Sequence, residues 1–268
     1  MSSDHSDAPI LVQRDGSVLL VTYNRPERLN AWTERLAERY FAVLHDADND
    51  PTVRSIVVTG AGRGFCAGAD FDELTTIVDG ARPTDNEPRE VFPWTISKPL
   101  IAAINGPAAG MGLLQALLCD VRFCVPEAKL TTSFAHRGLN AEWGMAWLLP
   151  RLVGLGRALD LLLSARIVRG DEALGIGLVD RIVEPPELLE AAMQYARDLG
   201  ENCSPAAMAQ IKAEVRRALD VDFDTAVRES VDAMLQATRR PDFREGVNSF
   251  IEGRPPKFPG LGPRRGRG

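Results

Sequence analysis

The chain has 268 residues, which is enough for one large domain with a substantial buried core. Its hydrophobic content of 45% and charged content of 25% are those of an ordinary globular protein. The formal net charge of −6 argues against nucleic acid as the main partner. The first residues lack a basic and an apolar signal region, and no apolar stretch is long enough to span a membrane. The sequence therefore predicts a cytoplasmic protein with no membrane partner.

The four cysteines are Cys66, Cys119, Cys124 and Cys203. They show neither C-x-x-C spacing nor nearby histidines, which are the patterns typical of metal sites and redox motifs. We therefore expect reduced, buried thiols and no metal site.

The N-terminal part of the chain predicts a hairpin followed by a helix. The strands Ile10–Arg14 and Val18–Tyr23 are expected to be joined by a turn at Asp15–Gly16. Thr33 has a typical N-cap side chain, and we expect the helix that follows it to run to about Asp46.

Two glycine-rich turns are the most informative feature of the chain. The first follows the apolar run 55–59 and reads GAGRGFCAGAD over residues 60–70. The second follows residues 99–104 and reads NGPAAGMG over residues 105–112, ahead of the apolar run 113–118. Each pattern indicates a strand, a tight turn and a helix start, so each can aim a backbone N–H into a shared cleft. Two such N–H groups converging on one oxygen make an oxyanion hole, as an enolate formed from a thioester requires.

A dinucleotide-binding loop is a weaker interpretation of the first turn. The two overlapping G-x-G-x-x-G frames end in Phe65 and Ala67 instead of glycine, and alanine is only sometimes allowed there.

The remaining segments predict a loop, short strands and a helical end. Residues 75–94 hold three prolines and several acids, which is typical of a variable loop or short helices that set substrate specificity. Short strands are expected at Val121–Val125 and Ile182–Val183. Beyond Pro185 the helices are expected at Glu187–Leu199, Pro205–Leu219, Phe223–Thr238 and Pro241–Phe250.

Taken together, these motifs resemble the crotonase (enoyl-CoA hydratase/isomerase) superfamily. The resemblance extends to NRPERLNA at residues 24–31, LPRLVG at 149–154 and FIEGR at 250–254, and it covers about residues 10–260. It implies an α/β fold, a crotonase-like spiral of ββα units with a helical C-terminal trimerisation region.

The change to a wholly helical pattern marks a boundary near residue 200, with the coenzyme A and active-site core expected at residues 10–200 and an oligomerisation region at 201–260. The resemblance implies that this helical end packs on neighbouring subunits in a homotrimer or a dimer of trimers. Residues 1–9 and 261–268 are expected to be disordered ends.

By resemblance, the backbone N–H groups of Ala69 and Met111 are the two oxyanion donors. Family members usually carry glycine at the second donor, so the side chain of Met111 is expected to reshape the acyl pocket. The family's C-terminal lysine is replaced by Gly253, beside Arg254. The residues implied to contact coenzyme A are Arg28, Leu29, Ala67, Ala69, Asp70 and, from a neighbouring subunit, Phe250.

The acid/base position separates the possible reactions. The two glutamates of typical hydratases align with Leu114 and Phe134, which cannot orient a water molecule. Glu142 aligns with the single carboxylate base of Δ3,Δ2-enoyl-CoA isomerases, where it moves a proton between two carbons. We expect burial beside Trp143 and Trp147 to raise its pKa. The alternative interpretation is that Glu142 has no catalytic role and is an acid at the N-terminus of a helix, where the helix dipole favours a negative charge.

The sequence therefore predicts an isomerase of enoyl-CoA double bonds, with no cofactor beyond the coenzyme A of the substrate. A hydratase or another thioester reaction is the alternative within the family, and a non-catalytic acyl-CoA-binding protein is the alternative of another class. His136 is a weaker candidate for the acyl pocket, because no serine or cysteine partner is visible for it.

Overall fold

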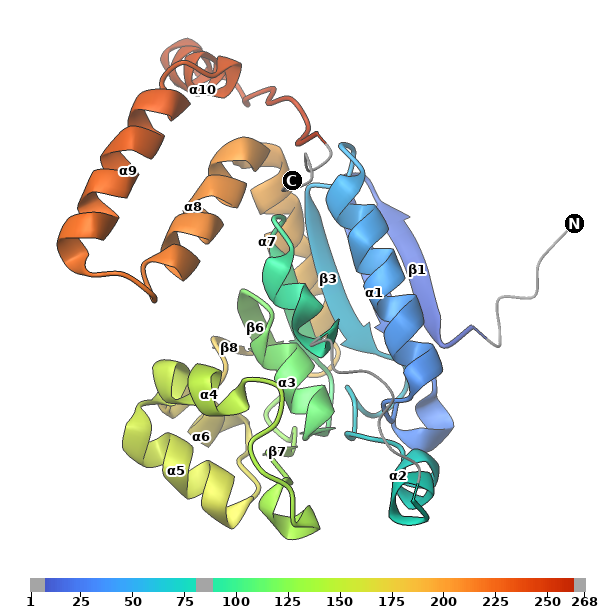
Figure 1. Cartoon of the computed structure of the whole chain (residues 1–268). Helices are drawn as coiled ribbons and strands as arrows, with labels where there is room; N and C mark the ends of the chain where they lie inside the picture. Colours follow the sequence, from blue (N-terminus) through green and yellow to red (C-terminus); the bar gives the residue numbers. More distant parts are fainter. Residues whose placement is uncertain (1–7, 81–88, 263–268) are drawn as a thin grey trace, which may run out of the picture.

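The computed structural model describes residues 8–80 and 89–262. In this part of the chain the main sheet has the strand order β1-β2-β3-β4-β6-β8, and β5 pairs with β7 in a small second sheet (Figure 1). Among the strands of the described residues, β1 and β2 pair antiparallel and the other neighbouring strands pair parallel. The strands are β1 (Ile10–Asp15), β2 (Val18–Tyr23), β3 (Ser55–Gly60), β4 (Leu100–Ile104), β5 (Ala108–Ala109), β6 (Val121–Cys124), β7 (Leu130–Thr131) and β8 (Arg181–Ile182).

The predicted strands are present, and the hairpin turn differs by one residue. Asp15 pairs with Val18, so the two-residue loop is Gly16–Ser17 and not Asp15–Gly16. Gly16 has a φ of +55°, which is the left-handed conformation that such a tight turn demands and glycine adopts readily.

Strands and helices are interspersed up to β8, with α4, α5 and α6 in succession before it, and only helices follow β8 in the described residues. Thr33 caps α1 as predicted, its Oγ accepting a hydrogen bond of 3.2 Å from the N–H of Leu36. The helices are α1 (Glu34–Asn49), α2 (Phe71–Val78), α3 (Met111–Leu117), α4 (Met145–Val153), α5 (Leu155–Ser164), α6 (Gly170–Gly175), α7 (Leu188–Asn202), α8 (Pro205–Arg217), α9 (Phe223–Ala237) and α10 (Pro241–Glu252). The 3₁₀ segments are η2 (Pro26–Arg28), η3 (Arg89–Thr95) and η4 (Ala135–Arg137).

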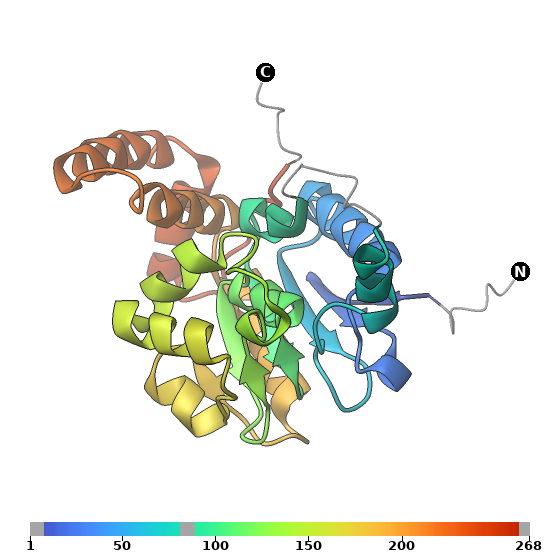
Figure 2. The ribbon, with the colours of Figure 1, turned by 60° about the horizontal axis from the view of Figure 1, so that its bottom comes forward.

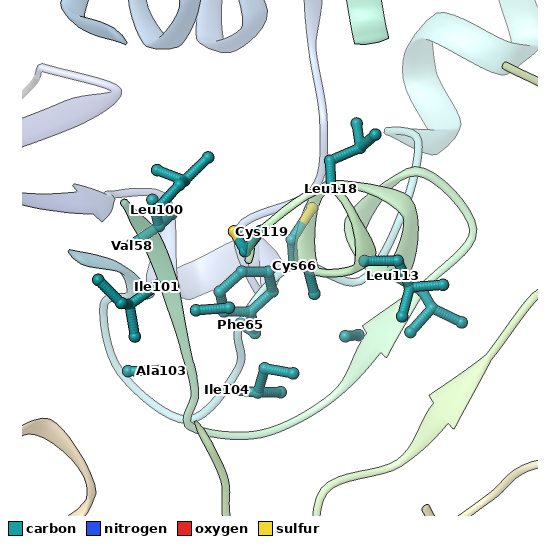
Figure 3. Close-up of a cluster of buried hydrophobic side chains, with 14 of the residues drawn as sticks. Val58, Phe65, Cys66, Leu100, Ile101, Ala103, Ile104, Leu113, Leu118 and Cys119 are labelled. Atoms are coloured by element: carbon teal, nitrogen blue, oxygen red, sulfur yellow. The ribbon is translucent and has the colours of Figure 1, made fainter. Parts of the chain in front are cut away.

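The core is centred on β3 and β4, which are buried along their whole length, as expected for central parallel strands. Figure 3 shows Val58, Ile101 and Ile104 of these strands among the buried side chains around Phe65 and Cys66 of the first glycine-rich turn. The first turn is therefore anchored in the buried core of the protein.

The C-terminal helices divide into one that covers the sheet and three that project from it. Helix α7 packs against the sheet, and Ser55 donates a 2.9 Å hydrogen bond to the carbonyl of Ala196. Helices α8, α9 and α10 extend away from the sheet in both views (Figures 1 and 2). Lys212 on α8 ties this extension to the body by a 2.8 Å hydrogen bond to the carbonyl of Lys98 and an ion pair with Asp120.

Some predictions fall on segments that the structure does not describe. Residues 81–88 of the predicted loop lie outside the described residues, as do 1–7 and 263–268 of the predicted disordered ends. On either side of the loop, α2 and η3 are short helices of the kind expected there. None of the described helices is long and apolar enough to cross a membrane.

The cysteines are free thiols. Cys66, Cys119 and Cys124 are buried and Cys203 is partly exposed. Burial raises the pKa of each of the three buried thiols to about 12, so they are unreactive near neutral pH. No group of histidine, cysteine or acidic side chains that could hold a metal ion occurs among the residues described.

Candidate active site

The two glycine-rich turns are fastened to each other by backbone hydrogen bonds. The N–H of Ala109 bonds to the carbonyl of Cys66 at 3.1 Å, and the N–H of Cys66 bonds to the carbonyl of Pro107 at 3.1 Å. Gly112 lies so close that a Cβ there would be 2.0 Å from the carbonyl oxygen of Cys66. Only glycine permits this approach, which brings the start of α3 against the first turn.

The first predicted donor, the N–H of Ala69, has no acceptor within the described part of the chain. Trp32 bonds instead to the residues on either side. Its N–H donates to the carbonyl of Gly68 at 2.7 Å, and its carbonyl accepts from the N–H of Asp70 at 2.9 Å. The amide of Ala69 is thus held in place and left available to a ligand.

The second predicted donor belongs to the first residue of α3. The N–H of Met111 has no acceptor among the described residues, as is usual for the first turn of a helix. Gly110 precedes it with a φ of +48°, and its own N–H bonds to the carbonyl of Thr131 at 3.0 Å. Because backbone hydrogen bonds of Cys66 join the two turns, the two unbonded amides belong to neighbouring turns.

Asp70 directly follows the first donor and is buried. Its carboxylate pairs with the guanidinium of Arg25 at 2.8 Å and accepts a 3.0 Å hydrogen bond from the N–H of Asp72, so it caps the N-terminus of α2. Burial alone would raise the pKa of Asp70, but these bonds outweigh it and lower the pKa below its usual 3.8. The same guanidinium donates to the carbonyl of Ala31 at 2.7 Å.

Two residues of the segment 24–31 have structural roles that the sequence analysis did not assign. Arg25 joins the segment to Asp70, and Asn30 joins it to the first turn. The fully buried Asn30 amide donates to the carbonyls of Ala61 and Gly64 at 3.0 and 2.8 Å, with its backbone at a φ of +56°. Asparagine tolerates this conformation better than most residues, so the asparagine at position 30 is the feature of the sequence that could have indicated this role.

The residues implied to contact coenzyme A lie in two places. Arg28 is exposed and forms an ion pair of 3.0 Å with Asp72, close to the first turn. The carbonyl of Leu29 accepts a 3.0 Å hydrogen bond from the N–H of Ala67, which joins the segment to that turn. Phe250 lies on α10 and is 88% exposed. Helix α10 belongs to the projecting C-terminal helices and lies far from α2 (Figure 1).

Arg254, beside the missing lysine, is held within its own chain. Its guanidinium makes hydrogen bonds of 2.6 and 3.0 Å with the carboxylate of Glu245, and a further one of 2.5 Å with Glu252. A phosphate would therefore have to compete with two carboxylates for this side chain.

The two positions that align with hydratase glutamates are apolar and buried. Leu114 lies on α3 and is fully inaccessible, and Phe134 is 4% exposed before η4. Neither can hold or activate a water molecule.

Glu142 is half-buried in the turn before α4. The helix begins three residues later, after Trp143 and Gly144 take positive φ values of +49° and +78°. The Glu142 side chain makes no hydrogen bond or ion pair with the described residues, and burial raises its pKa above the usual 4.5. The predicted direction of this pKa shift is confirmed. A carboxylate so placed can accept a proton more readily than an exposed one.

The loop that carries Glu142 reaches the helix that follows the first turn. Arg137 of η4 places its guanidinium 5.4 Å from the ring centroid of Phe71, the first residue of α2. His136, the weaker candidate, is exposed in η4.

Comparison with known proteins gives the same family along almost the whole chain. Residues 13–261 match the family model described as enoyl-CoA hydratase/isomerase. The 1,2-epoxyphenylacetyl-CoA isomerase of Escherichia coli K12 is 34% identical over 258 residues, which cover 94% of this chain and 98% of that protein. The short-chain-enoyl-CoA hydratase of Clostridium acetobutylicum is also 34% identical, over 91% of this chain and 95% of its own.

Solved structures are similar over the same range. A probable enoyl-CoA hydratase/isomerase from Mycobacterium abscessus superposes with a TM-score of 0.88 at 30% identity, covering 94% of this chain and 99% of its own. An enoyl-CoA hydratase from Bacillus anthracis gives a TM-score of 0.86 at 29% identity, covering 94% of this chain and 100% of its own. The predicted fold class is thereby confirmed.

Proposed function

Because the chain belongs to the enoyl-CoA hydratase/isomerase family, we propose that it moves the double bond of an enoyl-CoA from the 3 to the 2 position, with Glu142 as the acid/base. The observation that carries this proposal is the distribution of carboxylates. Glu142 is half-buried and has no partner among the described residues, while Leu114 and Phe134 are apolar. A proton shuttle requires one carboxylate and no activated water.

The proposed reaction starts with the thioester oxygen between the amides of Ala69 and Met111. Glu142 takes a proton from the α carbon, and the electron pair of that C–H bond moves to give an enolate whose charge the two N–H groups stabilise. The protonated Glu142 then returns the proton to the γ carbon. The double bond forms between the α and β carbons and the thioester carbonyl is restored, so atoms and charge balance.

Coenzyme A would lie along the segment 24–31 and the first turn. Arg28 is the proposed phosphate contact, because an exposed guanidinium can grip phosphate through two donors, and Asp72 is its only competitor among the described ion pairs. The other proposed contacts with coenzyme A around Arg28 are Leu29, Ala67, Ala69 and Asp70. The names of both relatives, an isomerase and a hydratase of CoA thioesters, support an acyl-CoA substrate.

Assembly into a homotrimer or a dimer of trimers is part of the proposal, because large apolar side chains are exposed. Helix α5 exposes a stripe of Leu155, Leu159 and Leu163, and α8 to α10 line an apolar groove of about 650 Å³ whose walls include Phe250 and Ile251. Apolar surfaces of this kind mark protein–protein interfaces. Sedimentation at micromolar concentration should give a trimer or hexamer, and a stable monomer would contradict this part of the proposal.

Two substrates separate the possible activities. We expect incubation with a 3-enoyl-CoA to give the 2-enoyl isomer, and incubation with a 2-enoyl-CoA to give no 3-hydroxyacyl-CoA. Hydroxylated product from the 2-enoyl substrate would instead establish the hydratase. Absence of product from both, with acyl-CoA binding retained, would identify a non-catalytic acyl-CoA-binding protein.

A further inference from the structure

Two buried side-chain oxygens beside the candidate active site have no hydrogen-bond partner among the residues that the structure describes. They are Oε2 of Glu90 and Oε1 of Gln115. Gln115 is fully buried and Glu90 is 8% exposed. Buried polar atoms in folded proteins almost always have partners, so two neighbouring exceptions require an explanation.

The orientation of the Gln115 amide is set by its surroundings. Its Nε2 donates to the backbone carbonyl of Glu90 at 2.9 Å and contacts Sδ of Met111 at 3.6 Å. A reversed amide would bring Oε1 against that carbonyl oxygen, which is also an acceptor. The unpaired atom of Gln115 is therefore an acceptor, as is the unpaired atom of Glu90.

Gln115 lies one helical turn beyond the proposed second oxyanion donor. Gln115 follows Met111 by four positions in α3, which corresponds to a rise of about 6 Å along the helix, a length that an acyl chain spans with several carbon–carbon bonds. Helical side chains tilt toward the N-terminus, and the contact with Sδ shows that Gln115 does so here. An acyl chain whose thioester oxygen rests on Met111 could reach this place if the flexible methionine side chain moves aside.

The chemistry of the pair calls for a hydrogen-bond donor without charge. The other carboxylate oxygen of Glu90 faces Nε of Arg89 at 3.5 Å, and the same guanidinium also forms an ion pair with Glu34. A neutral O–H would complete the carboxylate without bringing a further charge into the buried site. One hydroxyl can donate to Glu90, and a water molecule held by it can donate to Gln115.

We propose that Glu90 and Gln115 form a polar subsite that binds a hydroxyl group on the acyl chain, several carbons from the thioester. This inference rests on the proposed acyl-CoA function. It makes these residues determinants of specificity, because an unsubstituted acyl chain would leave both buried oxygens unpaired while a hydroxylated chain satisfies them.

The test measures binding and not turnover. Dissociation constants are compared for hexanoyl-CoA and for hexanoyl-CoA with a hydroxyl on carbon 4, 5 or 6, by titration calorimetry with the wild type, Glu90→Gln and Gln115→Met. We expect the wild type to prefer one hydroxylated ligand by about tenfold or more, as a charge-assisted hydrogen bond would give. Each variant should lose most of that preference and keep its affinity for hexanoyl-CoA.

Gln194→Met is the matched control, because Gln194 pairs with Asp198 on the exposed face of α7. If Gln115→Met fails to fold, Glu90→Gln, which keeps the side-chain shape, decides the matter. A wild type without preference, or variants that keep it, would overturn the subsite and indicate a structural water between the two oxygens. Because no step of the test requires turnover, that result would leave the proposed isomerase intact, and absence of isomerisation would not affect the binding preference.

Discussion

Trp32 bonds to both neighbours of Ala69 and not to Ala69 itself. Its N–H and carbonyl form bonds of 2.7 and 2.9 Å with Gly68 and Asp70, which makes an isolated parallel bridge centred on Ala69. In a parallel bridge the central residue directs its own amide away from the partner. The segment that contains Trp32 therefore orients the first proposed oxyanion donor.

Replacing Ala69 by proline should test this donor. Proline removes the N–H, and loss of one oxyanion donor lowers turnover by roughly a hundredfold or more. Ala69→Gly keeps the N–H and serves as the matched control. Turnover of the 3-enoyl-CoA is measured in both, with thermal unfolding to confirm the fold. Unchanged turnover in a folded Ala69→Pro variant would remove this residue from the site.

The second donor offers a cleaner substitution. Met111 is the first residue of α3, a position where proline is favoured because its missing N–H has no helical partner. Met111→Pro should therefore fold normally and lose roughly a hundredfold or more in turnover. Met111→Leu keeps the amide and changes the side chain to a similar extent. If both variants lose the same activity, the side chain and not the N–H is responsible.

The ion pair between Arg25 and Asp70 should stabilise the first turn. Asp70 is buried, and removing its partner leaves an uncompensated charge, so Arg25→Met should lower the free energy of unfolding by about 3 kcal/mol. Arg28→Met is the control for stability, because the pair between Arg28 and Asp72 is exposed and contributes less than about 1 kcal/mol. Denaturant unfolding compares the two, and equal losses would refute the special role of Arg25.

The sequence predicts the elements around the site better than the bonds that join them. The strands that enter the turns and the capped helix after Thr33 follow from local patterns, and they are present. The pairing of Arg25 with Asp70 spans the whole of α1 and β3, so no local spacing indicates it. Only the three-dimensional structure brings Glu90 of η3 to Gln115 of α3, since a single polar residue in either segment is unremarkable in the sequence.

The pH dependence of stability should reveal the buried state of Glu142. Its pKa in the folded chain is raised above the usual 4.5 by burial, so folding disfavours the charged form. That destabilisation is fully present above the folded pKa and disappears as the pH falls below the unfolded value. Glu142→Gln should therefore unfold at a higher denaturant concentration than the wild type at pH 8, with the difference shrinking toward pH 4. A difference of constant size would exclude this cause.

The same residue decides the proposed chemistry. Glu142→Gln keeps the shape and removes the basicity, so isomerisation should fall by roughly a hundred- to ten-thousandfold, as is typical of a positioned acid/base group. Affinity for a saturated acyl-CoA should barely change, because the amides of Ala69 and Met111 are untouched. In the wild type, turnover should fall as the pH is lowered through the raised pKa of Glu142, since only the carboxylate accepts the proton.

Glu187→Gln is the matched control for Glu142→Gln, because Glu187 is an exposed glutamate just before α7. It should leave turnover and its pH profile unchanged. Near-full activity in Glu142→Gln would place the base elsewhere, and His136 or an acid of the segment 75–94 would become the next residue to replace. Glu90 lies in that segment, so the variant Glu90→Gln would then distinguish two roles. A role in catalysis would lower the turnover of every substrate, whereas the proposed role in hydroxyl binding would change only the preference for hydroxylated ligands.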